Sequence, residues 1–268
     1  MKSFIGYKLL QVLRDPLSIV LLIVFLYMLI FLYIPLAVSV GEILLGGGVN
    51  TGIIANSLPI LVRSVLIALI SSALCLLIAI PISYLLSFYT KPLEKNMFIV
   101  LILAPYWVGS LLKIYALAYL ILVLESIAGT RILYTETSLY IGLIYNYSPL
   151  AIIPIFLSME RIDRTHIETS RSLGAGALYT LFRVILPISS PGITSAFFLV
   201  FAGVVGEVVV PQILMGASNY MVGQWIYQLT FSFHRLSDAS LLSMLYLILT
   251  LALLVLIVRR GGAGGFTI

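Results

Sequence analysis

Long apolar stretches with almost no charge dominate this sequence, and they constrain its fold more than any other feature. Charged residues make up 9% of the chain and hydrophobic residues 62%, with a mean hydropathy of +1.17. A soluble domain carries roughly 25% charged residues. This chain therefore cannot cover itself with a water-facing surface, and we expect lipid to be its solvent.

The apolar stretches predict an all-α, polytopic membrane protein with one transmembrane domain over residues 1–268. Each stretch is long enough to cross ~30 Å of hydrocarbon at ~1.5 Å per residue. The six predicted spans are residues 17–40, 58–89, 96–124, 139–158, 188–215 and 239–258. No cleavage site of the A-x-A type follows the first stretch, so we expect it to be retained as a span.

The positions of the basic residues predict the orientation of these spans. With the N-terminus in the cytoplasm, eleven of the 15 Lys and Arg residues lie on the cytoplasmic side. They are Lys2, Lys8, Arg14, Lys91, Lys95, Arg161, Arg164, Arg171, Arg183, Arg259 and Arg260. Cytoplasmic loops carry an excess of Lys and Arg, so both termini are expected in the cytoplasm. The net charge of +5 then reflects membrane topology, and we expect no nucleic-acid partner.

Several kinds of catalytic site are excluded by the sequence. His166 and His234 are expected on opposite sides of the membrane, so they cannot form a zinc-binding pair. The single Cys75 lies in an apolar stretch, where a small core residue is expected. No G-x-x-x-x-G-K-[ST] phosphate loop is present. We therefore predict a protein that is not an enzyme and holds no cofactor or metal of its own.

The most highly charged of the predicted inner loops is the segment 160–187. Asp163 can cap a helix start, and Gly174 can adopt the left-handed conformation that ends a helix. A second short helix is expected near residues 178–184, and Pro187 suits the first turn of the next helix. Helix-stabilising charge pairs are expected within the first helix: Glu160 with Arg164, Arg164 with Glu168, and Glu168 with Arg171. The alternative is a solvated loop that lies on the lipid headgroups.

This segment resembles the coupling motif, or EAA motif, of ABC importer permeases. The motif contains Glu-Ala-Ala, then Gly after three residues, and Ile-x-Leu-Pro nine residues later. The residues at the matching positions are Glu168, Thr169, Ser170, Gly174, Val184, Leu186 and Pro187. Thr169 and Ser170 replace the usual alanines, and Val184 replaces the usual isoleucine. Glu168, Thr169, Ser170, Gly174, Leu186 and Pro187 are accordingly the expected ATPase-coupling residues.

Other stretches are similar to the spermidine/putrescine type of these permeases. They include "LAPYWVGSLLKIYAL", "GLIYNYSPLAIIPIFLSMERID" and "GEVVVPQILMGASNYMVGQWIYQ". The resemblance implies a type I ABC importer permease fold of six transmembrane helices in a prokaryotic inner membrane. It also implies ATPase subunits that bind ATP and Mg, a second permease subunit and an extracytoplasmic substrate-binding protein. It implies a polyamine as cargo and a heterodimer of permeases, although the sequence itself is also compatible with a homodimer.

Residues of the spans supply candidates for the substrate path. Glu207 is a candidate because ionisable residues inside a membrane are costly; the alternative is a structural hydrogen-bond acceptor paired with Lys113 or Arg63. Asn146 lies just before Pro149 and is the polar residue best suited to line a path. Aromatic rings can hold ammonium groups but also form interfacial belts. The aromatic candidates are Trp107, Tyr115, Tyr145 and Trp225.

Three alternatives remain for the function. The same ATP-driven machine can carry another small solute, such as ferric ion, sulfate or a phosphonate. An ion-coupled secondary transporter is disfavoured by the segment 160–187 and by the lack of charged pairs at mid-membrane. An intramembrane enzyme is disfavoured because the sequence offers neither a metal site nor an activated nucleophile.

Overall fold

The computed structural model describes residues 16–45, 51–216 and 220–261, and the described residues contain helices and no strands. The longest helices are α2 (Pro16–Leu45), α3 (Thr51–Phe88), α6 (Glu136–Glu160) and α13 (Leu236–Gly261). The middle of the chain contributes α4 (Pro92–Trp107), α5 (Ser110–Ala128) and α10 (Ser190–Val205). The shorter elements are α7 (Arg164–Ser172), α8 (Ala177–Thr180), η1 (Leu181–Ile185), α9 (Leu186–Ile188), α11 (Val209–Leu214), α12 (Val222–Tyr227) and η2 (Gln228–Ser232).

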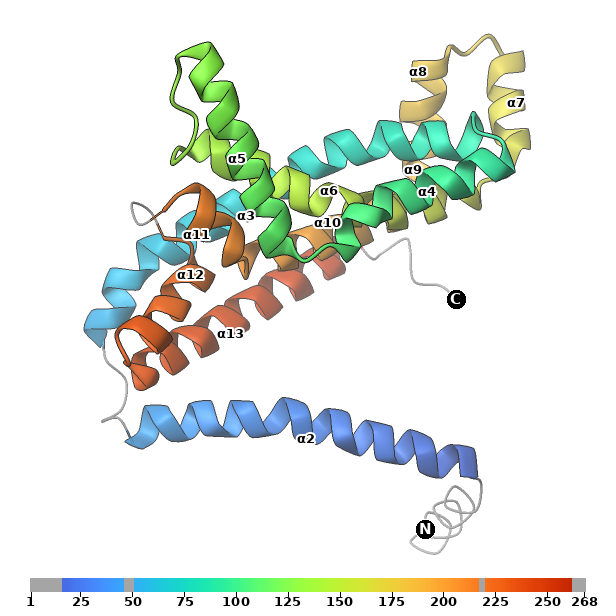
Figure 1. Cartoon of the computed structure of the whole chain (residues 1–268). Helices are drawn as coiled ribbons and strands as arrows, with labels where there is room; N and C mark the ends of the chain where they lie inside the picture. The colour runs from blue at the N-terminus through green and yellow to red at the C-terminus, as the bar shows by residue number, and fades with distance from the viewer. Residues whose placement is uncertain (1–15, 46–50, 217–219, 262–268) are drawn as a thin grey trace, which may run out of the picture.

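Helices α3, α6 and α10 form the centre of the bundle, where each of them packs against the other two (Figure 1). The buried face of α3 carries small side chains at helical spacing: Ser64, Ala68, Ser72, Cys75 and Ala79. Small residues let helix backbones approach closely where lipid supplies no hydrophobic driving force. Gly192 on α10 has the same role, since a Cβ there would lie 2.6 Å from the carbonyl oxygen of Pro154 on α6. The expectation that Cys75 is a small core residue is confirmed.

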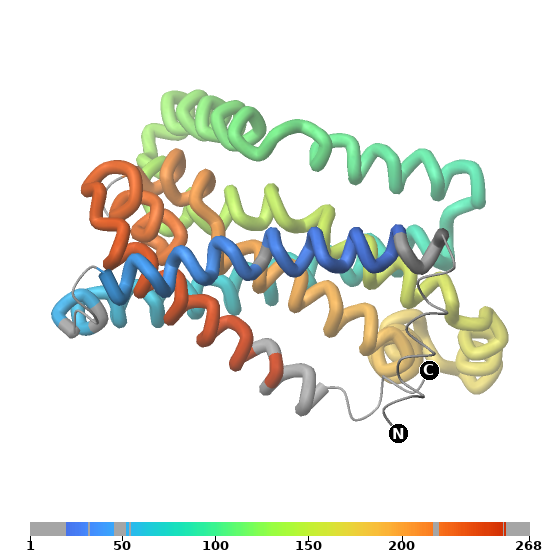
Figure 2. Tube along the Cα trace, turned by 90° about the horizontal axis from the view of Figure 1, so that it is seen from below, coloured from blue at the N-terminus to red at the C-terminus, as the bar shows by residue number. Residues whose placement is uncertain are grey.

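The outer helices surround this centre unequally. Helices α4 and α5 run along one edge of the bundle, as Figure 2 shows. Helix α2 packs along α13 and leaves most of its apolar side chains exposed; Val20, Phe25 and Phe31 are examples. That exposure fits a helix whose surroundings are lipid rather than water.

Two of the expected spans are interrupted in the structure. The stretch 96–124 forms two helices because Val108 and Gly109 are extended between α4 and α5. Pro105 removes a backbone donor three residues before this break, and Gly109 has low helix propensity. The stretch 188–215 is interrupted after Val205, so that α10 and α11 are separate helices.

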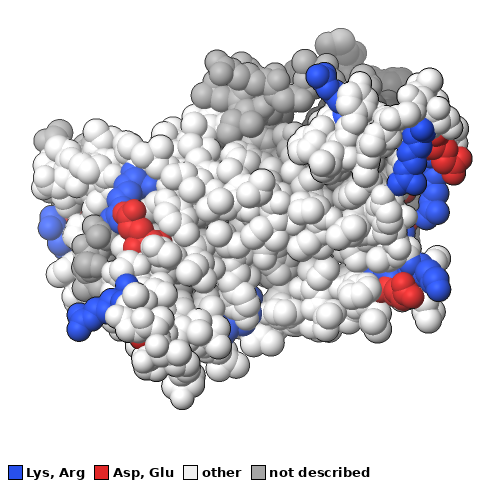
Figure 3. Space-filling model, turned by 90° about the horizontal axis from the view of Figure 1, so that it is seen from above, with Lys and Arg blue, Asp and Glu red and all other residues white. Residues whose placement is uncertain are grey.

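Among the residues that the structure describes, five helices are long and apolar enough to cross a membrane, and six if the bent pair Ala177–Ile188 and Ser190–Val205 makes one span. The two parts of that pair meet at 75°. On the face shown in Figure 3, most charged side chains gather at two ends, with a broad uncharged band between them. The expected all-α architecture of about six membrane helices is confirmed.

Candidate functional site

The segment between α6 and α10 folds into two short helices that project from one end of the bundle (Figure 1). We call residues 160–187 the α7–α8 hairpin. Its first helix begins at Asp163, whose carboxylate accepts hydrogen bonds from the Thr165 N–H at 3.0 Å and the Thr165 hydroxyl at 2.8 Å. These donors, the backbone N–H first, lower the pKa of Asp163 below its ordinary value. The predicted helix cap is confirmed.

Gly174 ends the first helix in the left-handed conformation, with φ of +83°. The Ala175 N–H donates to the Ser170 carbonyl at 3.1 Å, and the Gly174 N–H donates to the Arg171 carbonyl at 2.9 Å. This pair of bonds is the Schellman motif, which satisfies carbonyls that a helix end leaves free. A Cβ at residue 174 would meet no described atom within 4 Å. The glycine is therefore required for its backbone conformation and not for space.

The second half of the hairpin returns the chain to the bundle through α8, η1 and α9. The hydroxyls of Ser170 and Thr180 lie 3.0 Å apart, and both side chains are buried between the two arms. Pro187 lies near the end of the helical stretch Ala177–Ile188, just before the bend that leads into α10. The expected second short helix is confirmed, whereas Pro187 ends this second arm and does not begin the next span.

The far end of the hairpin presents apolar side chains to solvent. Leu173, Leu178, Tyr179 and Phe182 are between 61% and 83% exposed. A hollow of about 630 Å³ opens between the two arms, and Thr169, Gly174 and Tyr179 are among the residues that line it. Glu168 is exposed on α7. Exposed apolar residues with a polar rim are typical of a protein-binding surface.

The charge pairs expected within the hairpin are wrong, and two of their members, Glu160 and Arg171, bind residues outside the hairpin instead. Glu160 binds Lys95 at the start of α4, with Nζ–Oε distances of 2.7 and 2.8 Å. Arg171 donates to the hydroxyl of Tyr89, next to the end of α3, at 2.8 Å. None of the three predicted pairs is an ion pair among the described residues. The base of the hairpin is therefore joined to α3 and α4 by polar contacts.

A second candidate site is a group of buried polar side chains within the bundle. We call Lys113, Asn146, Tyr147 and Glu207 the polar cluster; they come from α5, α6 and the break between α10 and α11. Lys113 Nζ donates to Asn146 Oδ1 at 2.9 Å, and Asn146 Nδ2 donates to Glu207 Oε2 at 3.3 Å. Lys113 Nζ also lies 5.3 Å from the centroid of the Tyr106 ring. The amide of Asn146 thus connects two opposite charges.

The carboxylate of Glu207 has a donor for each of its lone pairs. Oε1 accepts from the Val208 and Val209 N–H groups at 3.0 and 2.9 Å. Oε2 accepts from Asn146 and from the Tyr147 hydroxyl, which lies 2.6 Å away. A carboxylate accepts about four hydrogen bonds, and Glu207 is only 8% exposed. The geometry thus matches the structural alternative, with Lys113 as the partner through Asn146.

The structure does not gather the expected path residues into one site. Glu207 and Asn146 meet in the polar cluster. Trp107 is 86% exposed at the end of α4. Trp225 donates from Nε1 to the Ser57 hydroxyl at 3.2 Å. Tyr145 is 42% exposed on α6, and Tyr115 lies on α5, away from the cluster.

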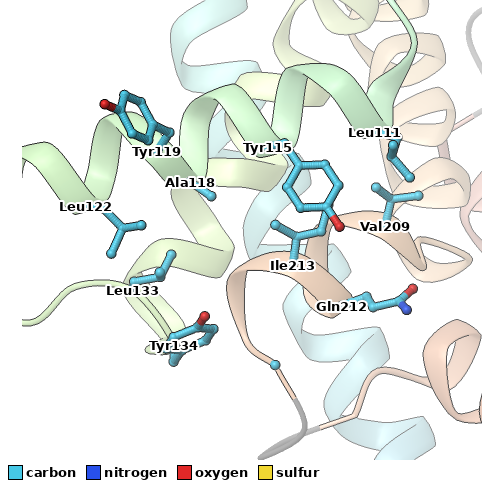
Figure 4. Close-up of a pocket in the computed structure, with 11 residues that line it drawn as sticks. Leu111, Tyr115, Ala118, Tyr119, Leu122, Leu133, Tyr134, Val209, Gln212 and Ile213 are labelled. Carbon is cyan, nitrogen blue, oxygen red and sulfur yellow. The ribbon is translucent and has the colours of Figure 1, made fainter.

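Tyr115 belongs to a groove between α5 and α11, drawn in Figure 4. Its volume is about 610 Å³. We call it the tyrosine groove, because three of its 11 lining residues are tyrosines. The lining residues are Leu111, Tyr115, Ala118, Tyr119, Leu122, Leu133, Tyr134, Val209, Gln212, Ile213 and Gly216.

Several residues of these sites had not been expected. Tyr147 directly follows Asn146 and was not selected as a site residue, although its hydroxyl donates to Glu207. Tyr119 follows Tyr115 by four residues, a spacing that places both on one helix face and that could have identified the groove. Nothing in the local sequence indicates that Tyr134 or Gln212 joins them. Within residues 16–45, 51–216 and 220–261, no group of three or more His, Cys, Asp or Glu side chains could hold a metal ion.

Sequence relatives support the resemblance to importer permeases, although no family model matches the sequence. The spermidine/putrescine transport system permease protein PotB of Escherichia coli is 30% identical over 178 residues, which cover 62% of this chain and 64% of the relative. PotB of Haemophilus influenzae is 33% identical over 169 residues, covering 59% and 58%. The inner membrane ABC transporter permease protein YdcU of E. coli is 24% identical, covering 76% of this chain and 72% of YdcU. The chain thus spans less than two thirds of the length of the PotB relatives.

Solved structures share the fold over a larger part of the chain. A chain of a bacterial ABC transporter involved in the import of the acidic polysaccharide alginate superposes with a TM-score of 0.71 at 14% identity, covering 93% of this chain and 96% of that one. A chain of the MetNI methionine ABC transporter gives a TM-score of 0.53 at 18% identity, covering 77% and 95%. The predicted importer-permease fold and the resemblance to spermidine/putrescine-type permeases are confirmed.

Proposed function

We propose that this chain, a relative of the PotB permeases with the fold of an ABC importer permease, is a permease subunit of an ATP-driven importer. It forms half of a translocation path for a small solute. The cargo we propose is a polyamine, since the PotB relatives carry spermidine/putrescine permease names. Ferric ion, sulfate and phosphonates are the alternative cargoes.

The α7–α8 hairpin is the observation that carries this proposal. It projects from the bundle and is held in shape by the Asp163 cap, the Gly174 turn and the bond between Ser170 and Thr180. Its exposed apolar end offers a surface that a separate ATPase can bind. Its base is joined to α3 and α4 through Tyr89 and Lys95. A hairpin held in this way can transmit a displacement of its tip to the spans.

Each coupling residue has a proposed role in this contact. Glu168 and Thr169 face outward on α7 and contact the ATPase. Ser170 and Gly174 hold the two arms at their fixed angle. Leu186 and Pro187 connect the second arm to α10 and pass the motion to the bundle.

The remaining partners follow from the same proposal. ATP and Mg bind to two ATPase subunits, so this chain carries no nucleotide chemistry. A second permease, homologous but not identical, completes the path, and an extracytoplasmic binding protein delivers the cargo. The complex resides in a prokaryotic cell membrane, with both termini of this chain in the cytoplasm.

Reconstitution tests the proposal. The complex is purified through a tag on this chain, placed in proteoliposomes with its binding protein, and supplied with labelled spermidine and ATP. We expect uptake that requires ATP, and we expect Glu168→Lys or Gly174→Asp to abolish it without preventing assembly. Glu168→Gln is the matched control, since it keeps the size of the side chain without adding a cation.

Three outcomes separate the alternatives. Uptake driven by an ion gradient without ATP would replace the importer with a secondary transporter. ATP-driven uptake of sulfate or a phosphonate, but not of spermidine, would support an ATP-driven importer with a different cargo. Undiminished uptake by both Glu168→Lys and Gly174→Asp would remove the hairpin from the mechanism.

A further inference from the structure

We propose that the tyrosine groove is the surface on which this subunit binds the ammonium groups of its cargo, through aromatic faces and without a carboxylate. The names of the relatives describe a transport system and say nothing about this groove. The inference rests on the proposed function and adds to it a binding site and a mode of recognition.

The groove presents three tyrosine rings from two parts of the chain. Tyr115 and Tyr119 lie one helical turn apart on the same side of α5, with ring positions shifted by about 6 Å along the helix. They are 55% and 71% exposed, and Tyr134 is 61% exposed. Figure 4 shows Tyr115 above α11 and Tyr134 at the other end of the groove. More than half of the surface of each of these tyrosines is therefore left uncovered by the rest of the described chain.

The backbone at Tyr134 is held in an unfavourable conformation. Its φ is +64°, in a region that costs a bulky residue energy. Neighbouring contacts fix it: the Tyr134 N–H donates to the Leu214 carbonyl at 2.9 Å, and the Glu125 carboxylate accepts from the Ile132 and Leu133 N–H groups. The ring packs against Gly216, where a Cβ would lie 3.3 Å from Tyr134 Cδ1. Several independent contacts thus hold this ring at the groove.

The chemistry of the lining favours a cation that carries N–H donors. Ring faces attract ammonium groups within about 6 Å, and the Tyr hydroxyls and the Gln212 carbonyl can accept hydrogen bonds. None of the 11 described lining residues is charged. A sulfate or phosphonate requires Arg, Lys or clustered N–H donors, and ferric ion requires carboxylate or comparable oxygen ligands. The groove therefore fits a polyamine better than the alternative cargoes.

Glu207 has a different role in this arrangement, because its carboxylate is occupied by four protein donors. Two of these donors are the N–H groups of Val208, just before α11, and of Val209, its first residue. Helix α11 supplies Val209, Gln212 and Ile213 to the groove wall. Glu207 is therefore a positioning residue that holds one wall of the groove without touching the cargo.

The test uses the complete complex in proteoliposomes, with loaded binding protein in excess so that delivery is not limiting. The readout is spermidine imported per ATP hydrolysed. We expect Tyr115→Leu and Tyr119→Leu to lower this ratio by about two- to thirtyfold, the range that one cation–π contact supplies. Tyr115→Phe and Tyr119→Phe retain the ring and should keep most of the ratio.

Tyr33→Leu is the matched control, because Tyr33 is a 60% exposed tyrosine on α2, outside the groove. If a Tyr→Leu variant fails to assemble, Gln212→Leu tests the opposite wall. Normal wild-type transport with unchanged ratios in both Tyr→Leu variants would overturn the inference and leave the proposed function intact. If the ratio of spermidine imported to ATP hydrolysed fell equally in the Phe and Leu variants, recognition by ring faces would be contradicted. Absence of ATP-driven spermidine uptake in the wild type would instead contradict the proposed function.

Discussion

The α7–α8 hairpin and the polar cluster are ordered by different kinds of contact. The bonds that shape the first helix of the hairpin join residues two to five positions apart, such as Asp163 with Thr165 and Ser170 with Ala175. The bonds of the cluster join residues 33 and 61 positions apart, Lys113 with Asn146 and Asn146 with Glu207. The first helix of the hairpin is therefore shaped by local contacts, whereas the cluster exists only when three helices have packed.

This difference predicts that substitutions in the two regions have different effects. A substitution in the hairpin should change the shape of the hairpin and leave the bundle folded. A substitution in the cluster should change the stability of the whole bundle, because a buried charge left without its partner is costly. The following three experiments test this comparison.

The largest effect is expected for Glu207→Leu. Removing one partner of a buried charge pair costs about 3–5 kcal/mol, and here it leaves Lys113 without a compensating charge and the α11 N–H groups without an acceptor. The readout is thermal unfolding, followed as labelling of Cys75, which is the single cysteine of the sequence and fully buried. We expect a large decrease in the midpoint temperature.

The double variant Lys113→Met with Glu207→Leu is the control. It removes both charges, so it should be more stable than the sum of the two single losses predicts. Glu207→Gln, which keeps the size of the side chain, should lower stability and uptake together. Strictly additive losses would show that the two charges are not coupled. A loss of uptake with unchanged stability in Glu207→Gln would make Glu207 a cargo contact after all.

An intermediate effect is expected at Gly174. The left-handed conformation costs an L-residue roughly 1–2 kcal/mol, and no described atom blocks a side chain there. The loss of ATP-driven uptake should therefore be smallest in Gly174→Asn, larger in Gly174→Ala and largest in Gly174→Val, because a β-branched residue tolerates this conformation least. The Cys75 labelling temperature should stay near that of the wild type in all three. A decrease in that temperature as large as for Glu207→Leu would abolish the distinction between the two regions.

The same distinction explains what the sequence could predict. The Asp163 cap and the Gly174 turn depend on neighbours in the chain, and both are confirmed. The charge pairs of Glu160 and Arg171 were wrong because Lys95 and Tyr89, more than 60 positions away, are better placed. Glu207 was recognised as unusual because of its residue type, but its donors Asn146 and Tyr147 depend on how α6 packs against the break after α10.

The breaks in the helices show a further limit of prediction from the sequence. A hydrophobic stretch such as 96–124 predicts that residues lie in lipid, but it does not predict that the helix is continuous. The interruption at Val108 and Gly109 gives α5 its own direction, and this direction creates the groove with α11. The groove could therefore not be predicted from hydropathy. The sequence does contain Tyr115 and Tyr119 at helical spacing, but this spacing alone does not place α11 beside them.

The smallest effect is expected at Asp163, where pH supplies the test. The Thr165 donors lower the pKa of this exposed carboxyl from its ordinary value of 3.8. A carboxylate with a depressed pKa stabilises the folded form at every pH above the ordinary value, and this contribution is lost as the pH falls through the lower, folded pKa. Hydrogen exchange of the α7 amides, corrected for intrinsic rates, should therefore show constant protection of wild-type α7 from pH 8 to pH 5 and a decrease below pH 3.8. Asp163→Asn keeps a capping acceptor without the charge, so its protection should not vary with pH, and Asp163→Ala should be less protected throughout. A wild-type decrease that begins above pH 5 would show that a group other than Asp163 controls the helix start.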